Sequence, residues 1–219
     1  MSKLFKLPIE EYLVRVRVSL ETALRNLEIL AALEIVDYGE VKIAAGLDLL
    51  DQADLLFEVQ KTAYNQRYTA TETLYQARTA ADERYEKNRD LALLVFKRDS
   101  DRQRQLGIDQ PKERSFSGWL RQVQRFYDNA LAAPEIVEAL SRYNLTQADL
   151  ESGLALVQDA GQRYQLREEK KAAAQQATKD RDAACTALDV WFGDFAGFAE
   201  YALADKPQLV EALQLGIVR

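Results

Sequence analysis

The sequence has no histidine and one cysteine among its 219 residues. Histidine is the side chain that most often acts as a general base near neutral pH, and it is also the commonest metal ligand. A single thiol, Cys185, excludes an internal disulfide and most thiolate metal sites. It lies in the alanine-rich run DAACTALDV, which favours packing over nucleophilic chemistry. These absences argue against an enzyme, and the sequence predicts no cofactor and no metal site.

The chain also has no long apolar run and no surplus of basic residues. No segment approaches the roughly 18 uninterrupted apolar residues that a membrane span needs. Charges interrupt the N-terminal stretch MSKLFKLPIEEYLV, which therefore lacks the apolar core of a signal peptide. The formal net charge is −6, whereas proteins that grip phosphates normally show a basic face. We expect a cytoplasmic protein without a membrane span and without a nucleic-acid partner.

Helix breakers are scarce, with four prolines and nine glycines in the whole chain. Between Pro8 and Pro111 the sequence is rich in Ala, Leu, Glu, Gln, Arg and Lys, which lose little side-chain freedom on a helix. No stretch alternates β-branched and polar residues with the period of a strand. Because 47% of the residues are apolar, the composition predicts a folded, all-α protein.

Cap and turn residues divide the chain into long helices. Thr146 followed by Asp149 predicts a helix start, because the hydroxyl and the carboxylate can satisfy free backbone amides there. Segment 99–116 is charged and contains Gly107 and Pro111, so we expect it to be a linker. The predicted helices cover about 9–36, 40–99, 117–142 with a fresh start at Pro134, 146–204 and 208–215.

Two similar octets stand 107 positions apart, GLDLLDQA at 46–53 and GLALVQDA at 153–160. The similarity extends beyond them without a gap, and ten of 34 residues are identical between 20–53 and 127–160. An ungapped match of this length is more than shared helical composition produces. It therefore predicts an internal duplication.

The ends of the two halves match as well, since Gln-Leu-Gly-Ile occurs at 105–108 and again at 214–217. We predict a first helical repeat at 1–108 and a second at 109–219, each with a short helix followed by a very long one. The expected fold is an elongated helical bundle in which the two repeats form one intertwined domain.

The two long helices are expected to run antiparallel about a pseudo-twofold axis. The first carries tyrosines in its middle, among them Tyr68, where the second is rich in alanine. Because large residues facing small ones keep the packing density constant, we pair residues whose numbers sum to about 251, such as Tyr68 with Ala183. The alternative breaks the helices near 66–72 and 173–179 and gives two separate three-helix bundles.

The octet glycines, Gly46 and Gly153, fall about seven residues into the predicted long helices. Glycine costs about 1 kcal/mol relative to alanine inside a helix. Its presence in both repeats despite that cost indicates that another helix comes close there. We expect the preceding short helix to make this approach in each repeat.

The densest aromatic cluster is WFGDFAGFAEY, which begins at Trp191. Trp191, Phe195 and Phe198 have the i, i+4, i+7 spacing of one helix face, which is typical of core packing. Gly193 and Gly197 form a G-x-x-x-G pattern that permits a neighbouring helix to come close. Because aromatic residues are favoured interface anchors, the second interpretation is a partner-binding patch made of Trp191, Phe195, Phe198 and Tyr201.

Three further groups have a functional and a structural interpretation, and we favour the structural one for each. Tyrosines that suit a ligand groove are better explained by packing between the long helices: Tyr64, Tyr68, Tyr75 and Tyr85. Arginines that suit an acidic partner are better explained by a solvated linker: Arg98, Arg102 and Arg104. Paired carboxylates are expected on solvated faces: Glu10-Glu11, Asp48 with Asp51, Asp82-Glu83 and Glu168-Glu169.

The sequence contains no motif that selects a reaction, a cofactor or a named partner. The leading hypothesis is a non-enzymatic helical scaffold or adaptor that binds another protein or associates with itself. The alternative is a small-molecule-binding or enzymatic bundle with a pocket where the short helices meet. A filled core with exposed apolar side chains would favour the first hypothesis, and an enclosed polar pocket would favour the second.

Overall fold

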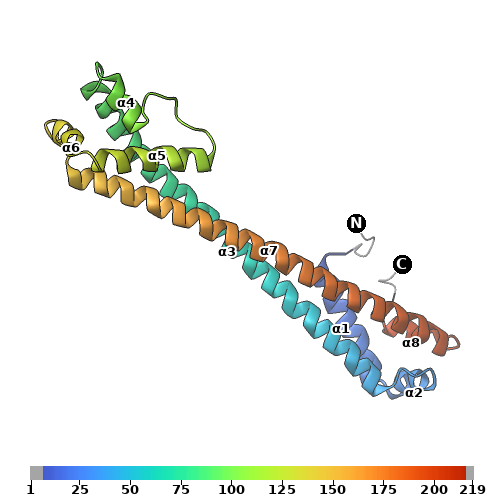
Figure 1. Cartoon of the computed structure of the whole chain (residues 1–219). Helices are drawn as coiled ribbons and strands as arrows, with labels where there is room; N and C mark the ends of the chain where they lie inside the picture. The colour runs from blue at the N-terminus through green and yellow to red at the C-terminus, as the bar shows by residue number, and fades with distance from the viewer. Residues whose placement is uncertain (1–6, 216–219) are drawn as a thin grey trace. The chain divides into compact units, whose positions relative to one another are not determined.

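A computed structural model describes residues 7–215 of the chain (Figure 1). Within this range the ordered elements are all α-helices, so the predicted all-α class is confirmed. In chain order they are α1 (Ile9–Arg25), α2 (Leu27–Ile35), α3 (Glu40–Val95), α4 (Ser100–Leu106), α5 (Phe116–Leu131), α6 (Pro134–Ser141), α7 (Gln147–Ala202) and α8 (Pro207–Ala212).

The first predicted helix is divided at Asn26. The backbone of Asn26 is extended (φ −94°, ψ 104°), and its side chain accepts hydrogen bonds from the amides of Glu28 (3.0 Å) and Ile29 (3.2 Å). An asparagine in this conformation is an N-cap and starts a new helix. The prediction of one helix over 9–36 is therefore wrong. Pro134 makes the corresponding division between α5 and α6, as predicted.

The segment expected to be a linker begins with the short helix α4. The carboxylate of Asp99 accepts a hydrogen bond from the amide of Arg102 (3.0 Å), which caps the start of α4. Gly107 ends the helix in the left-handed conformation, with φ 69°. The prediction of a linker over the whole of 99–116 is wrong for its first part, because Asp99 and Gly107 cap a helix at its two ends.

The two long helices, α3 and α7, have 56 residues each and run without a break. The breaks that the alternative placed near 66–72 and 173–179 are therefore absent, whereas its division of the chain into two units agrees with the two compact units that the structure forms. The predicted start of α7 is confirmed: the amide of Thr146 donates to the carboxylate of Asp149 (3.0 Å), and the amide of Asp149 donates to the hydroxyl of Thr146 (3.3 Å).

The long helices contribute to two compact units. Among the described residues, unit 1 comprises 7–64 and 173–215, and unit 2 comprises 65–172. Unit 1 thus combines the first part of α3 with the last part of α7, and unit 2 combines the last part of α3 with the first part of α7. Residues from both predicted repeats take part in each unit.

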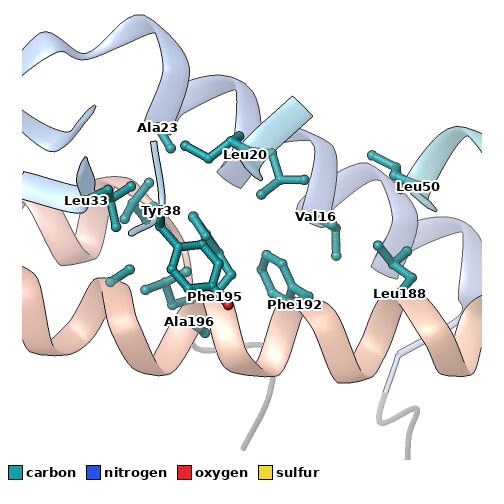
Figure 2. Packing of buried hydrophobic residues seen from close by; sticks show 14 of the residues in the cluster. Val16, Leu20, Ala23, Leu33, Tyr38, Leu50, Leu188, Phe192, Phe195 and Ala196 are labelled. Carbon is teal, nitrogen blue, oxygen red and sulfur yellow. The ribbon is translucent and has the colours of Figure 1, made fainter. Parts of the chain in front are cut away.

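The core of unit 1 is formed by α1, α2, α3 and α7 (Figure 2). Its fully buried side chains include Val16 and Leu20 from α1, Leu50 from α3, and Phe192 and Phe195 from α7. Burial of a side chain of this size contributes roughly 1.5–3 kcal/mol. The apolar stripe of α1 and the aromatic residues of α7 therefore hold unit 1 together.

The core of unit 2 is built around aromatic side chains of α5 and α3. Trp119, Phe126 and Tyr127 on α5 are fully buried, together with Tyr85 on α3. The ring of Phe126 packs edge-to-face against Tyr85 (centroids 5.5 Å apart) and against Tyr127 (5.0 Å). This geometry suits the quadrupoles of aromatic rings, and it fixes α5 against α3.

Corresponding elements of the two halves start 107 residues apart, as Ile9 of α1 and Phe116 of α5 do. The same offset holds for α2 and α6, for α3 and α7, and for α4 and α8. A polar contact recurs with it: Tyr12 donates its hydroxyl proton to Asp189 (3.3 Å) in unit 1, and Trp119 donates its indole N–H to Asp82 (2.7 Å) in unit 2. We call two positions 107 apart counterparts below.

The long helices pack antiparallel in unit 2, but the predicted register is wrong. Lys170 donates to the side-chain oxygen of Gln66 (3.0 Å), so paired residue numbers sum to about 236 rather than 251. In unit 1, Gly46 lies against Trp191, a sum of 237. The error is about 15 residues, or roughly 22 Å along a helix. In keeping with this, Tyr68 is not packed in a seam and is 75% exposed.

The octet glycines do admit a close approach, but from two different helices. A Cβ atom on Gly153 would overlap the phenol ring of Tyr127 on α5, the preceding short helix, as predicted. A Cβ atom on Gly46 would overlap the indole ring of Trp191, which comes from α7. For Gly46 the prediction that the preceding helix makes the approach is wrong. In unit 1 the smaller Leu20 stands at the counterpart of Tyr127, so the indole of Trp191 fills the space beside the glycine.

Candidate functional site

The four residues of the predicted partner-binding patch do not lie in one environment. Phe195 is fully buried in the core of unit 1, and Trp191 is half-buried with its ring stacked on Phe195 (centroids 5.6 Å apart, planes at 8°). Phe198 is 46% exposed and Tyr201 is 77% exposed. Core packing therefore accounts for the first two residues, and an exposed surface remains at the second two.

Tyr38, in the turn between α2 and α3, connects the buried and the exposed aromatic residues. Its ring packs edge-to-face against Trp191 (6.0 Å) and Phe195 (5.8 Å), and at a tilt against Phe198 (5.1 Å). Figure 2 shows Tyr38 beside Phe195 in this cluster. Sequence reasoning missed Tyr38, although an aromatic residue between two helices, in the turn Asp37-Tyr38-Gly39, was a usable signal.

The glycines of the G-x-x-x-G pattern face open space. A Cβ atom on Gly193 or on Gly197 would meet no atom within 4 Å. The prediction that another helix of the chain comes close at this pattern is therefore wrong for the part of the chain that the structure describes. Two open grooves follow this face of α7: one is lined by Gly193, Gly197, Phe198 and Tyr201, and the other by Leu49, Ala183, Ala187, Val190 and Trp191. Both grooves are also lined by Asp194.

The counterpart of this site in unit 2 is polar. Arg84 stands where unit 1 has Trp191, and Asn88 stands where unit 1 has Phe195. Asn88 is buried and donates its amide N–H to the hydroxyl of Tyr127 (3.1 Å), while Arg84 pairs with Asp149 (3.7 Å). The counterpart positions on α7 and α3 thus differ in chemistry: they carry aromatic side chains in unit 1 and hydrogen-bonding side chains in unit 2.

Burial raises the pKa of Tyr127 to about 12, although its hydrogen bond with Asn88 acts in the other direction. Above pH 10 the unfolded chain loses this phenolic proton first, so the folded state loses stability as the pH rises from about 10 to 12. We expect wild type to lose about 2 kcal/mol relative to Tyr127→Phe over this range. Urea unfolding of both proteins at several pH values measures the difference.

The comparison with Tyr127→Phe separates this effect from other titrations. The lost hydrogen bond to Asn88 lowers the stability of Tyr127→Phe equally at every pH, and burial raises the pKa of Tyr12 and Tyr85 in both proteins. These contributions cancel in the pH dependence of the difference. Parallel stability curves for the two proteins between pH 10 and 12 would contradict the prediction.

The other candidate groups are explained by local structure. Cys185 is buried in unit 1, and burial raises the pKa of its thiol, which disfavours a reactive thiolate. Arg102 and Arg104 pair within their own segment, with Asp99 and Asp101 (3.1 Å each). In residues 7–215 no cluster of three or more metal-ligating side chains occurs.

The prediction that the four tyrosines pack between the long helices is wrong for Tyr68 and Tyr75. Tyr85 is fully buried in the core of unit 2, whereas Tyr68 and Tyr75 are 75% and 72% exposed. Tyr64 belongs to unit 1 and is 41% exposed. The four tyrosines therefore lie in different environments, and only Tyr85 is packed in a core, where its ring contacts Phe126 of α5.

Among the helices of residues 7–215, none has both the length and the apolar character needed to cross a membrane. Comparisons with protein-family models, with curated proteins and with solved structures find no significant match to this chain.

Proposed function

We propose that the protein is a non-enzymatic helical scaffold or adaptor that binds another protein through unit 1. The observation that carries this proposal is the distribution of exposed apolar side chains. Of the sixteen large exposed apolar residues in the described part of the chain, eleven belong to unit 1 and five to unit 2. The two units are of similar size, so the difference reflects their surfaces.

Counterpart positions make the contrast specific. On α1, Val14 is 62% exposed, and its counterpart on α5 is Arg121. Ile35, at the end of α2, is 87% exposed, and its counterpart next to α6 is Arg142. The counterpart positions in unit 2 therefore carry a charged residue where unit 1 carries an exposed apolar one. Folding does not require the apolar residue there, so we assign these exposed side chains to association with another protein.

We also infer that the two halves arose by duplication. The common offset of the helix starts supports this, and so does the buried pattern, in which Val16, Ala23 and Ile29 have the buried counterparts Val123, Ala130 and Ile136. A duplicated fold supplies two equivalent surfaces. One of them can evolve to bind a partner while the other keeps polar residues exposed to solvent.

The rival function is a small-molecule-binding bundle. Its best support is an open cavity on unit 2 that is lined by Glu83, Arg84, Lys87, Asn88 and Leu156. This cavity opens beside the buried Asn88 and Tyr127 pair, but it mixes acidic and basic groups and has little apolar lining. Drug-sized ligands are held mainly by apolar walls with a few polar groups, so the exposed surface of unit 1 supports the adaptor more strongly.

Capture from a native lysate tests the proposal. The baits are wild type, Val14→Arg/Val18→Arg on α1, and Val190→Glu on α7, which introduce the counterpart residues Arg121, Arg125 and Glu83. We expect wild type to retain a partner in about stoichiometric amounts and at least one unit 1 variant to lose it.

The matched control is Leu166→Arg, which places an arginine at an exposed leucine of unit 2. This variant should retain the partner. Wild type that captures no partner and is monomeric by light scattering would overturn the proposal. Equal capture by all four baits would overturn the assignment to unit 1.

A further inference from the structure

One face of α7 in unit 1 carries a heptad-spaced stripe that nothing in residues 7–215 covers. Its members are separated by 4, 3, 4, 3 and 4 residues and are all exposed: Ala183, Ala187, Val190, Asp194, Gly197 and Tyr201. On a helix this spacing makes a narrow line. The line lies opposite the core side chains of α7, and the two open grooves run along it.

The stripe is not a requirement of the fold. Its counterparts on α3 are also exposed, and they are mostly polar or charged: Gln76, Ala80, Glu83, Lys87, Asp90 and Leu94. Ala183 replaces a glutamine, Val190 replaces a glutamate and Gly197 replaces an aspartate. A solvated helix face has thus become small and apolar in α7 alone. Small residues on a heptad line let a second helix come close, as in coiled-coil packing.

The surroundings of the stripe are acidic. Between Asp182 and Ala202 the helix has four acidic residues and no lysine or arginine: Asp182, Asp189, Asp194 and Glu200. Asp182 pairs with Arg181, and Asp189 accepts the hydroxyl proton of Tyr12, so the carboxylate that the stripe itself presents is Asp194. The counterpart segment of α3, 75–95, is balanced because it also contains Arg78, Arg84, Lys87 and Arg89. Asp194 lies within the stripe, where α3 has Lys87. A partner that covers this face must therefore supply positive charge.

We propose that the α7 stripe binds a basic amphipathic α-helix of another protein. Large apolar residues of that helix, spaced by three and four, fill the line from Ala183 to Gly197, and a lysine or arginine pairs with Asp194. This is recognition of a helix in a groove. A second copy of α7 fits poorly, because its own stripe carries Asp194 and no lysine or arginine. The inference rests on the proposed function and names the chemistry of the partner.

Two synthetic helical peptides of about 21 residues, which is three heptads or roughly six turns, test the charge and the shape together. Both have leucine at every a and d position. The flanking positions are lysine and arginine in one peptide and glutamate in the other. We expect the full-length protein to bind the basic peptide at least about tenfold more tightly than the acidic one, with weaker binding in high salt. Fluorescence of Trp191, which lines one groove, reports binding.

The matched variants are Ala187→Arg on the stripe and Ala80→Arg at its counterpart on α3, both exposed alanines. Ala187→Arg should weaken binding of the basic peptide about tenfold or more, by bulk and by like charge, and Ala80→Arg should leave it unchanged. Asp194→Lys, which introduces the type of residue found at position 87, should remove the preference for the basic peptide.

Equal binding of the two peptides, equal effects of Ala187→Arg and Ala80→Arg, or no binding would each overturn the proposal. These results differ from a failure of the proposed function. If a lysate partner is lost with Val14→Arg/Val18→Arg but kept with Val190→Glu, unit 1 still binds a protein, and the α7 stripe is not its site.

Discussion

Replacing Gly153 with alanine is expected to lower the free energy of unfolding by about 2 kcal/mol. Alanine is the better helix former by about 1 kcal/mol, so a substitution at an ordinary helical glycine would stabilise the protein. At this position the added methyl group overlaps the ring of Tyr127, whose side chain is fully buried. Neither the ring nor the backbone of α7 can yield without loss of core packing. Urea unfolding of wild type and variant measures the effect.

A double-mutant cycle identifies the ring as the cause. The second substitution is Tyr127→Leu, because the counterpart of Tyr127 in unit 1 is the buried Leu20. In that background Gly153→Ala should be neutral, or stabilising by up to about 1 kcal/mol. The coupling between the two positions would then be about 2–3 kcal/mol. Additive effects would contradict the packing explanation.

Gly46 provides an independent case of the same steric overlap between an added methyl group and an aromatic ring. Gly46→Ala is expected to be destabilising because of the indole of Trp191. Its cost should vanish in the Trp191→Arg background, which removes the indole and introduces the residue type found at the counterpart position, Arg84. A cost of Gly46→Ala that survives loss of the indole would assign the effect to the helix backbone.

Helix starts could be predicted where the sequence carries a complete local signal. Thr146 with Asp149 is such a signal, because both hydrogen-bonding groups lie within one turn. Asn26 was missed because it interrupts a continuous apolar pattern and caps α2 with its side chain alone. The helix α4 was missed because the charge of segment 99–116, together with Gly107 and Pro111, suggested a linker, although Asp99 and Gly107 are suitable caps at its two ends.

The register of α3 against α7 could not be predicted, because it depends on contacts between distant residues. Pairing large with small residues selected Tyr68 and Ala183, but both are exposed. The observed register instead seats Trp191 on Gly46. An exposed tyrosine has little cost, because apolar atoms form much of any protein surface. Size matching alone therefore does not decide between registers.

The four residues of the predicted patch belong to two different faces of α7, although the prediction placed them together. The i, i+4, i+7 spacing correctly indicated that Trp191 and Phe195 share a side of α7 with other core residues. Tyr201 falls on the heptad line with Val190 and Gly197, which faces away from that core. The sequence could have separated these faces, but only the structure shows that the second one is bare in residues 7–215.

Phe195→Ala is expected to lower the free energy of unfolding by about 4 kcal/mol, whereas Tyr201→Ala should change it by less than about 0.5 kcal/mol. Phe195 is fully buried and stacks with both Trp191 and Phe192, so its loss leaves a cavity among rings that cannot close it. Tyr201 is 77% exposed on α7. Both variants place alanine in the same helix, which makes them matched for helix propensity.

The same pair of variants separates folding from binding. Tyr201→Ala should weaken binding of the basic helical peptide while its unfolding curve overlays that of wild type, because an exposed aromatic residue on an interface acts as an anchor. Phe195→Ala should shift the unfolding curve to lower urea, and at urea concentrations where it remains folded its peptide affinity should stay near that of wild type. If Tyr201→Ala instead destabilises the protein as much as Phe195→Ala does, then Tyr201 is a core residue, and the exposed line on α7 ends before it.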